Sequence, residues 1–295
     1  MKERKKFRNR QEALFYEKIS GSDDVKCTLC PKFCLLKSGE IGECRTRSNR
    51  GGVLYSLNYG WLRALNMENI ERIPFMEYYN TMNVLSVGSW GCNMHCPYCS
   101  SLQLIEGSGI GRALYPNEIT QIVSKLQQKD CIGVAYSFGE PAVWYEYVLD
   151  TCREVKKLDM KNVISTNGMI NREPWLGLLE HIDAVNLDIK SMDDAWYDSW
   201  GGSLQTVLET AAAVKEKDLH LEITRVMIPG VNDDKSDIMA LVRFVSNELG
   251  KDVPLHFLEY IPKLSANYIR TPESDLTWAA DLAYTYLDNV YIGTP

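Results

Sequence analysis

The chain has 295 residues, of which 45% are hydrophobic and 24% are charged, and its formal net charge is −7. This size fits one large domain, or one domain with a small module, and the acidic balance argues against nucleic acid as a partner. No segment approaches the ~18 consecutive apolar residues of a membrane span, and we expect neither a membrane anchor nor a secretory signal. The nine cysteines therefore indicate reduced, metal-binding thiols in the cytoplasm.

The chain changes character near residue 80, where we place a domain boundary. Residues 1–80 form an irregular module rich in Gly and Cys, and residues 81–295 alternate between strand-like and helix-like segments. Strands are predicted at 83–87, 132–138, 162–166, 184–189, 219–228, 255–258 and 290–292. Helices are predicted at 116–128, 144–158, 173–181, 204–217, 234–249 and 273–286. Because six successive β–α units fall short of the eight of a closed barrel, we expect an α/β fold that is a (β/α)6 partial TIM barrel.

Four cysteines of the N-terminal module have the spacing of metal ligands: Cys27, Cys30, Cys34 and Cys44. Four thiolates close a tetrahedral site, and the C-x2-C start suits zinc. An auxiliary iron–sulfur cluster is the alternative, and four metal-free thiols are the third. A small glycine-rich module buries little apolar surface and needs a bound metal to stabilise its fold. This requirement slightly favours zinc over an iron–sulfur cluster.

Three further cysteines follow the first strand of the second region: Cys92, Cys96 and Cys99. Their C-x3-C-x2-C spacing differs from the cysteine runs of electron-carrying ferredoxins. Three thiolates this close hold three irons of a 4Fe–4S cube and leave the fourth iron open for chemistry. Cys131 and Cys152 lie at no ligand spacing, and we interpret them as core or surface thiols.

Polar residues lie at the ends of successive predicted strands, where barrels of this type form active sites. On the fourth strand, Asn186, Asp188 and Lys190 share one face, while Val185, Leu187 and Ile189 share the other. The apolar face suits packing under helices, and the polar face then points into the barrel, where it needs a polar ligand. Parity does not decide whether Thr224 or Arg225 faces inward. A single histidine such as His256 is more often a core residue than a functional one.

These motifs resemble the radical S-adenosylmethionine (SAM) superfamily. The residues that carry the resemblance are the three cysteines with Tyr98, the run Gly139-Glu140-Pro141, and the run Leu187-Asp188-Ile189-Lys190. In particular the chain resembles the pyruvate formate-lyase activating-enzyme branch, and within it the radical SAM enzymes of the AmmeMemoRadiSam system. Phrases such as Thr166-Asn167-Gly168-Met169-Ile170 and Ile228-Pro229-Gly230-Val231-Asn232-Asp233 support the closer similarity.

The resemblance implies a set of cofactor contacts. Cys92, Cys96 and Cys99 hold the 4Fe–4S cluster, and SAM chelates its open iron. Gly139 and Glu140 match the motif that meets the methionine ammonium group. The other residues that the resemblance assigns to the SAM pocket are Tyr98, Thr166, Asn167, Asp188, Lys190, Arg225 and His256, with Arg225 a weaker candidate for the carboxylate. Tyr98 is expected over the cluster or the adenine.

The resemblance also implies the reaction and the partners. Reductive cleavage of SAM gives methionine and a 5′-deoxyadenosyl radical, which abstracts hydrogen from a substrate that the sequence does not identify. A low-potential donor, flavodoxin or ferredoxin, supplies the electron, and Memo-type and AMMECR-type proteins are candidate partners. A glycyl-radical activase is the alternative enzyme, and an electron carrier or metal-binding scaffold is the alternative without catalysis. The longer family members carry a further cysteine pair beyond the barrel, which this sequence does not show.

Overall fold

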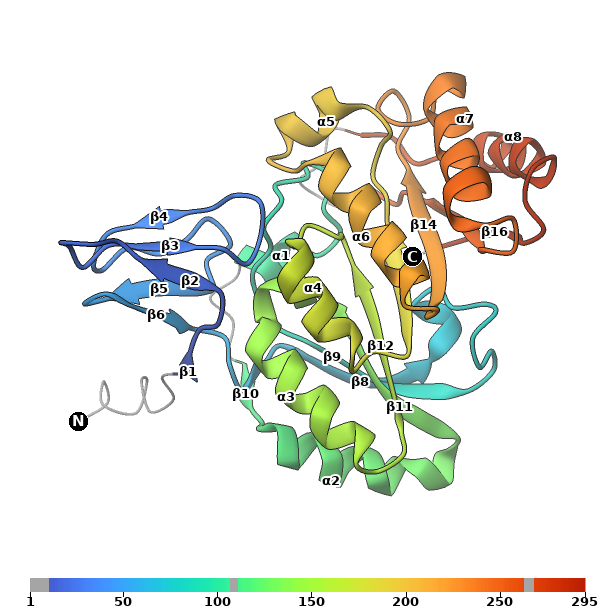
Figure 1. The fold of residues 1–295 in the computed structure, drawn as a ribbon. Helices are drawn as coiled ribbons and strands as arrows, with labels where there is room; N and C mark the ends of the chain where they lie inside the picture. Colours follow the sequence, from blue (N-terminus) through green and yellow to red (C-terminus); the bar gives the residue numbers. More distant parts are fainter. Residues whose placement is uncertain (1–10, 107–110, 263–267, 295) are drawn as a thin grey trace.

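The computed structural model describes residues 11–106, 111–262 and 268–294. Its centre is an eight-stranded sheet in the order β16-β15-β14-β13-β12-β11-β9-β8 (Figure 1). The pairs from β9 to β16 are parallel, and β8 joins β9 in the antiparallel direction. The strands are β8 Ala64–Asn69, β9 Asn83–Gly88, β11 Cys131–Phe138, β12 Lys161–Thr166, β13 Ala184–Asp188, β14 His220–Met227, β15 Leu255–Glu259 and β16 Val290–Gly293. The predicted partial barrel is confirmed, with each predicted strand displaced by no more than a residue or two.

Six helices cover the outer side of this sheet, as the alternating pattern predicts (Figure 1). They are α2 Pro116–Leu126, α3 Tyr145–Lys156, α4 Arg172–Leu179, α6 Leu204–Glu216, α7 Lys235–Phe244 and α8 Glu273–Tyr284. Two additional short helices, α1 Leu102–Glu106 and α5 Asp194–Ser199, follow β9 and β13. Single turns complete the barrel at η2 Ile70–Arg72, η3 Gln127–Lys129, η4 Pro141–Trp144 and η5 Val245–Leu249. Across the described residues, no helix is long and apolar enough to cross a membrane.

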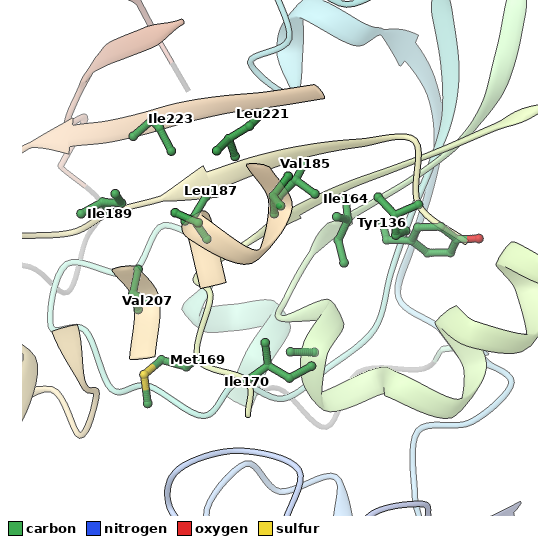
Figure 2. Packing of buried hydrophobic residues seen from close by; sticks show 14 of the residues in the cluster. Tyr136, Ile164, Met169, Ile170, Val185, Leu187, Ile189, Val207, Leu221 and Ile223 are labelled. Carbon is green, nitrogen blue, oxygen red and sulfur yellow. The ribbon is translucent and has the colours of Figure 1, made fainter. Parts of the chain in front are cut away.

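The apolar face of β13 packs under the helices, as its alternation predicts. Val185, Leu187 and Ile189 are fully buried, and Figure 2 shows them beside Val207 of α6. The amide of Asn186, on the other face, donates to Thr224 Oγ1 of β14 at 2.8 Å. Polar side chains therefore occupy the inner face of the barrel, where they satisfy one another.

The structure also shows which side chains of β14 His220–Met227 face into the barrel. Thr224 bonds to Asn186 inside the barrel, whereas Arg225 points to the helical side and pairs with Asp237 of α7. The guanidinium and the carboxylate are both buried, with Nη1 2.5 Å from Oδ1. Arg225 also donates to the backbone oxygen of Ile189 at 2.6 Å. The sequence could not give this direction, because neither face of β14 is uniformly apolar.

The amino end of the barrel is closed by the segment that precedes β9. Glu222 of β14 accepts hydrogen bonds there from the backbone N–H groups of Met76 at 3.0 Å and Glu77 at 2.9 Å. The same carboxylate contacts the imidazoles of His220 at 2.8 Å and His256 at 2.6 Å. His256 is thus a buried core residue that stacks on Tyr291, and it lies away from the cysteine loop.

Residues before β8 form two small antiparallel sheets of three strands, in the orders β1-β6-β5 and β2-β3-β4. Their strands are β1 Gln11–Glu12, β2 Tyr16–Lys18, β3 Val25–Cys27, β4 Leu35–Leu36, β5 Arg47–Arg50 and β6 Val53–Ser56. β7 Trp61–Leu62 pairs with β10 Arg112–Ala113. The boundary expected near residue 80 falls between β8 and β9, which pair in one sheet, and the division into domains stays a prediction.

A buried ion pair between Arg47 and Glu146 connects the N-terminal sheets to the barrel. Arg47 of β5 and Glu146 of α3 are 1% and 2% exposed, and Nη2 lies 2.5 Å from Oε1. Arg47 also donates to the Leu14 oxygen at 2.7 Å, and the Leu14 N–H donates to Glu146 at 2.9 Å. Each charge therefore has hydrogen-bond partners that offset its desolvation.

Candidate active site at the carboxyl end of the barrel

The three cysteines of the C-x3-C-x2-C motif lie on the loop between β9 and α1, here called the cluster loop (residues 89–101). All three thiols are half-buried. The sulfur of Cys92 accepts a hydrogen bond from the Met94 N–H at 3.4 Å and from Asn167 Nδ2 at 3.5 Å. Donors aimed at a sulfur are typical of thiolates that hold metal clusters, because they stabilise the negative charge.

Burial disfavours charge on the thiols of Cys92 and Cys96, and a metal overcomes that penalty. Burial raises the pKa of Cys96 to about 11, although the ammonium group of Lys190 acts in the opposite direction. Burial likewise raises the pKa of Cys92, with a smaller contribution from the carboxylate of Glu140. As free thiols, Cys92 and Cys96 stay protonated at neutral pH, so ligation must release their protons.

Lys190 and Asp188 form a partly buried ion pair beside the cluster loop. Lys190 Nζ donates to Asp188 Oδ2 at 2.7 Å. Burial alone lowers the pKa of Lys190, but Asp188 and the nearby Cys96 raise it well above its usual range. The other carboxylate oxygen, Asp188 Oδ1, is buried and makes no hydrogen bond within the described residues. A buried acceptor without a donor marks a place for a polar ligand.

Glu140 joins two strand ends beneath the cluster loop. Its carboxylate accepts hydrogen bonds from Thr166 Oγ1 at 2.6 Å, from Asn167 N–H at 2.9 Å and from Ala142 N–H at 2.9 Å. Burial raises the pKa of Glu140, and these hydrogen bonds offset part of the rise. Thr166 and Asn167, both at the end of β12, are thus tied to the residue that follows β11.

Gly139 has a steric role within the protein. Its φ is +78°, and a Cβ atom would lie 2.4 Å from the Ser89 backbone oxygen. Close approach of two chain segments explains the glycine.

Tyr98 lies in an aromatic group next to Cys99. It is 7% exposed and meets Trp200, Tyr260 and Tyr268 edge to face, with ring centroids 5.3, 6.4 and 6.2 Å away. Its hydroxyl is buried and has no partner within the described residues. Tyr98 Oη is therefore a second polar atom left over for a ligand at this end of the barrel.

The structure gathers some of the expected pocket residues and separates others. Residues at the carboxyl ends of β9, β11, β12 and β13 meet around the cluster loop: Cys92, Cys96, Cys99, Tyr98, Glu140, Thr166, Asn167, Asp188 and Lys190. Arg225 and His256 are directed elsewhere, to α7 and to Glu222. Cys131 and Cys152 are buried core thiols.

One residue of the site was missed by sequence reasoning. Asn93, inside the cysteine motif, is fully buried, and its Oδ1 accepts a hydrogen bond from Asn167 Nδ2 at 3.2 Å. Its Nδ2 donates to the Met169 oxygen at 2.5 Å. The available signal was a polar amide between two ligand cysteines.

The four N-terminal cysteines line one cavity. Cys27, Cys30, Cys34 and Cys44 share its wall with Asn93 and Val143. Burial raises the pKa of Cys30 to about 12. In the part of the chain that the structure describes, no three His, Cys, Asp or Glu side chains are assembled as ligands of a single ion. The shared cavity is the structural support for treating these four thiols as one set.

The chemistry of the cluster loop fits an iron–sulfur cluster with SAM beside it. The donor set is three thiols at the mouth of a parallel barrel, with N–H donors on Cys92 and a cation beside Cys96. Two buried polar atoms, Asp188 Oδ1 and Tyr98 Oη, have no hydrogen-bond partner among the described residues and can accept or donate to a polar ligand. The residues present therefore fit both groups.

Comparison with known proteins agrees with this geometry. The family model "Radical SAM superfamily" matches residues 88–244. The chain is 34% identical over 290 residues to an uncharacterized protein of Methanocaldococcus jannaschii, covering 95% of this chain and 85% of that one. It is 29% identical over 175 residues to the pyruvate formate-lyase 1-activating enzyme of Escherichia coli K12, covering 58% of this chain and 71% of the enzyme.

A further curated relative and two solved structures complete the comparison. The GTP 3′,8-cyclase of Limosilactobacillus fermentum is 30% identical over 58% of this chain, which spans about half (52%) of that enzyme. A radical SAM methyltransferase from Sphaerobacter thermophilus gives a TM-score of 0.58 at 15% identity, covering 72% of this chain and 66% of that one. Streptococcus suis SuiB gives 0.57 at 16% identity, covering 72% and 48%. These structures share the fold, and the matched family establishes that the chain belongs to the radical SAM superfamily and is related to the pyruvate formate-lyase activating enzymes.

Proposed function

We propose that Cys92, Cys96 and Cys99 hold a 4Fe–4S cluster and that the polar strand ends hold SAM, in an enzyme that abstracts hydrogen from an unidentified substrate. The observation that carries this assignment is the buried Asp188 Oδ1, which has no partner in the part of the chain that the structure describes and lies next to a charged Lys190 and the three thiols. When bound, the cluster and SAM supply the reductive cleavage that gives methionine and a 5′-deoxyadenosyl radical.

The roles of the protein side chains follow from their contacts. Asp188 accepts a hydrogen bond from SAM, and Lys190 balances the charge of Asp188 and of the thiolates. Glu140 holds the ends of β11 and β12 at a fixed separation through its three hydrogen bonds. Tyr98 and its aromatic neighbours exclude water from the cluster side of the site.

The finer assignments are also proposals. We place the enzyme with the AmmeMemoRadiSam-system enzymes, in the cytoplasm, with flavodoxin or ferredoxin as electron donor and Memo-type and AMMECR-type proteins as partners. A glycyl-radical activase is the second candidate, supported by the 29% identity to the E. coli activating enzyme. The N-terminal cysteines are proposed to bind zinc or a second iron–sulfur cluster, supported by their common cavity.

An anaerobic assay tests the central proposal. The protein is reconstituted with iron and sulfide, supplied with dithionite and SAM, and analysed for 5′-deoxyadenosine. We expect product from the wild type and from Cys131→Ala, a control that removes a buried thiol far from the motif, and none from Cys96→Ala. Product from Cys96→Ala contradicts the ligand assignment. If the electron paramagnetic resonance (EPR) spectrum of the cluster does not change when SAM is added, the electron-carrier alternative is supported instead.

Substitution of Asp188 tests the SAM pocket. Asp188→Asn removes the charge and the ion pair with Lys190 while keeping the shape. Because charge-assisted hydrogen bonds contribute ~1.5–3 kcal/mol, we expect about a 10- to 100-fold rise in KM for SAM. Asp194→Asn, on the exposed face of α5, is the matched control and leaves KM unchanged. An unchanged KM in Asp188→Asn removes Asp188 from the pocket.

A further inference from the structure

The four-cysteine cavity of the N-terminal module lies directly against the cluster loop. Asn93, which stands between Cys92 and Cys96, forms part of the wall of this cavity together with Cys30. Val143, two residues after the Glu140-Pro141 turn, forms another part. Elements that carry the proposed SAM site thus enclose the second set of thiols.

The backbones of the two regions are also in contact. A Cβ atom on Gly91 would lie 2.2 Å from Thr46 Cγ2 and 2.7 Å from the Cys44 oxygen, at a φ of +96°. Thr46 Oγ1 lies 3.2 Å from Cys44 Sγ and donates to the Val143 oxygen at 3.0 Å. The cluster loop at Gly91 therefore packs directly against the segment that carries Cys44 and Thr46.

Two buried amides lie between Cys92 and the four-cysteine cavity. Asn167 Nδ2 donates to Cys92 Sγ at 3.5 Å and to Asn93 Oδ1 at 3.2 Å. Asn93 in turn shares the wall of one cavity with Cys30. Hydrogen bonds thus run from Cys92 through Asn167 to Asn93, and Asn93 borders the cavity that Cys30 lines.

The orientation of each amide is fixed by a backbone partner. Asn167 Oδ1 accepts from the Met169 N–H at 2.8 Å, so its NH2 group must face Cys92 and Asn93. Asn93 Nδ2 donates to the Met169 oxygen, so its Oδ1 must face Asn167. With Asn93 fully buried and Asn167 6% exposed, water does not replace these bonds at low cost. A change at Cys30 is therefore transmitted to the donor on Cys92.

We propose that Cys27, Cys30, Cys34 and Cys44 form a tetrathiolate metal centre, and that Asn93 couples this centre to the cluster at Cys92, Cys96 and Cys99. The coupling rests on the proposed function, whereas the metal centre does not. Hydrogen bonds to ligand sulfurs tune the reduction potential of a cluster. A metal in the cavity beside Asn93 fixes the position of the amide pair that supplies one of these bonds to Cys92. Asn93 is in this sense a positioning residue. Zinc and an iron–sulfur cluster share the tetrathiolate chemistry, and the experiment distinguishes them.

The first arm measures metal uptake by the N-terminal cysteines alone. The variant with Cys92, Cys96 and Cys99 all changed to Ala is incubated anaerobically with zinc(II), or with iron(II) and sulfide, and metal per chain is measured. We expect one zinc, or the iron and sulfide of one cluster, retained after desalting and lost when Cys27→Ala is added. Retention of neither overturns the metal centre, whatever the radical SAM site does.

The second arm measures the midpoint potential of the cluster whose EPR signal responds to SAM. We expect Cys30→Ala and Asn93→Ala each to lower this potential, because a donor to Cys92 is loosened and the reduced state loses stabilisation. The double variant shifts no further than Asn93→Ala alone, since both changes break one pathway. Additive shifts, or an unchanged potential in Cys30→Ala, overturn the coupling.

Matched variants separate this coupling from general damage. Asn171→Ala also removes an amide between barrel and module, because Asn171 Nδ2 donates to the Thr28 oxygen at 2.7 Å, but it touches no cysteine. We expect it to leave the potential unchanged. If Cys30→Ala does not fold, Cys34→Ser is used in its place. The thiol of Cys34 is half-exposed, so this change perturbs the core less. Absence of any SAM-responsive signal in the wild type refutes the proposed function, while the first arm still tests the metal centre.

Discussion

Two buried carboxylates, Glu140 and Glu222, hold opposite ends of the barrel. Each accepts hydrogen bonds from two or more chain segments, and each removes unpaired N–H groups from an apolar interior. The sequence places Glu140 at a functional strand end, but it does not reveal Glu222. Its partners are brought to it by the fold, from 146 positions away in the case of Met76.

Glu222 gives the protein an acid-dependent contribution to stability. Burial raises the pKa of Glu222, but hydrogen bonds from His220 and His256 outweigh burial and lower it from 4.5 to about 2. A folded-state pKa below the unfolded value stabilises the protein above about pH 4.5, and this stabilisation is lost as pH falls toward 2. The shift corresponds to on the order of 3 kcal/mol.

We therefore expect the free energy of unfolding of Glu222→Gln to lie below that of the wild type near pH 6 and to approach it near pH 2 to 3 in urea titrations. Glu154→Gln, which removes an exposed ion pair with Lys157, is the control and changes stability by less than ~1 kcal/mol at either pH. A difference between Glu222→Gln and wild type that persists unchanged to low pH contradicts the assignment.

At the scale of elements, strands were predictable where buried apolar runs are bounded by polar residues. β12 and β13 are examples, because each is a run of β-branched and apolar residues at the centre of the sheet. β8 was not predicted. It is an edge strand that pairs antiparallel with β9, and its residues are mostly half-exposed, so its sequence shows little alternation between apolar and polar residues. The short helices α1 and α5 contain too few turns for a 3.6-residue period to appear.

The cluster loop depends on one glycine. Gly91→Ala adds a Cβ atom that overlaps Thr46 and the Cys44 backbone, and it strains a φ of +96°. We expect the loop to move and iron bound at the three cysteines to fall by more than half after reconstitution. Gly39→Ala has a comparable φ of +94° with open space around the Cβ position, so it isolates the cost of strain. Equal iron content in Gly91→Ala and Gly39→Ala contradicts the steric argument.

At the scale of the whole molecule, the N-terminal sheets and the barrel share a buried charge pair. The sequence predicted a cysteine-rich region followed by a partial barrel, and it predicted the cysteine loop and the polar strand ends. It could not predict how the two regions meet, because the pairing of Arg47 with Glu146 joins positions 99 residues apart. No local pattern of charge distinguishes these two residues from exposed ones.

Breaking this pair by one partner leaves an isolated buried charge. We expect Arg47→Met to lower the free energy of unfolding by ~3–5 kcal/mol, and the double variant Arg47→Met/Glu146→Gln to recover part of that loss. Arg172→Met, which removes an exposed pair with Glu216, costs less than ~1 kcal/mol. Urea denaturation measures all three, and a double variant no more stable than Arg47→Met argues against the pair as the source of the cost.

The floor formed by Glu222 and the segment at Met76 and Glu77 has a consequence for traffic through the enzyme. Because the hydrogen bonds of Glu222 hold this segment across the amino end of the barrel, we expect small molecules to reach the three thiols from the carboxyl end. On this expectation, the products of SAM cleavage leave through the same end of the barrel by which the next reactants enter. With a single route of this kind, product release has to precede the entry of the next reactants.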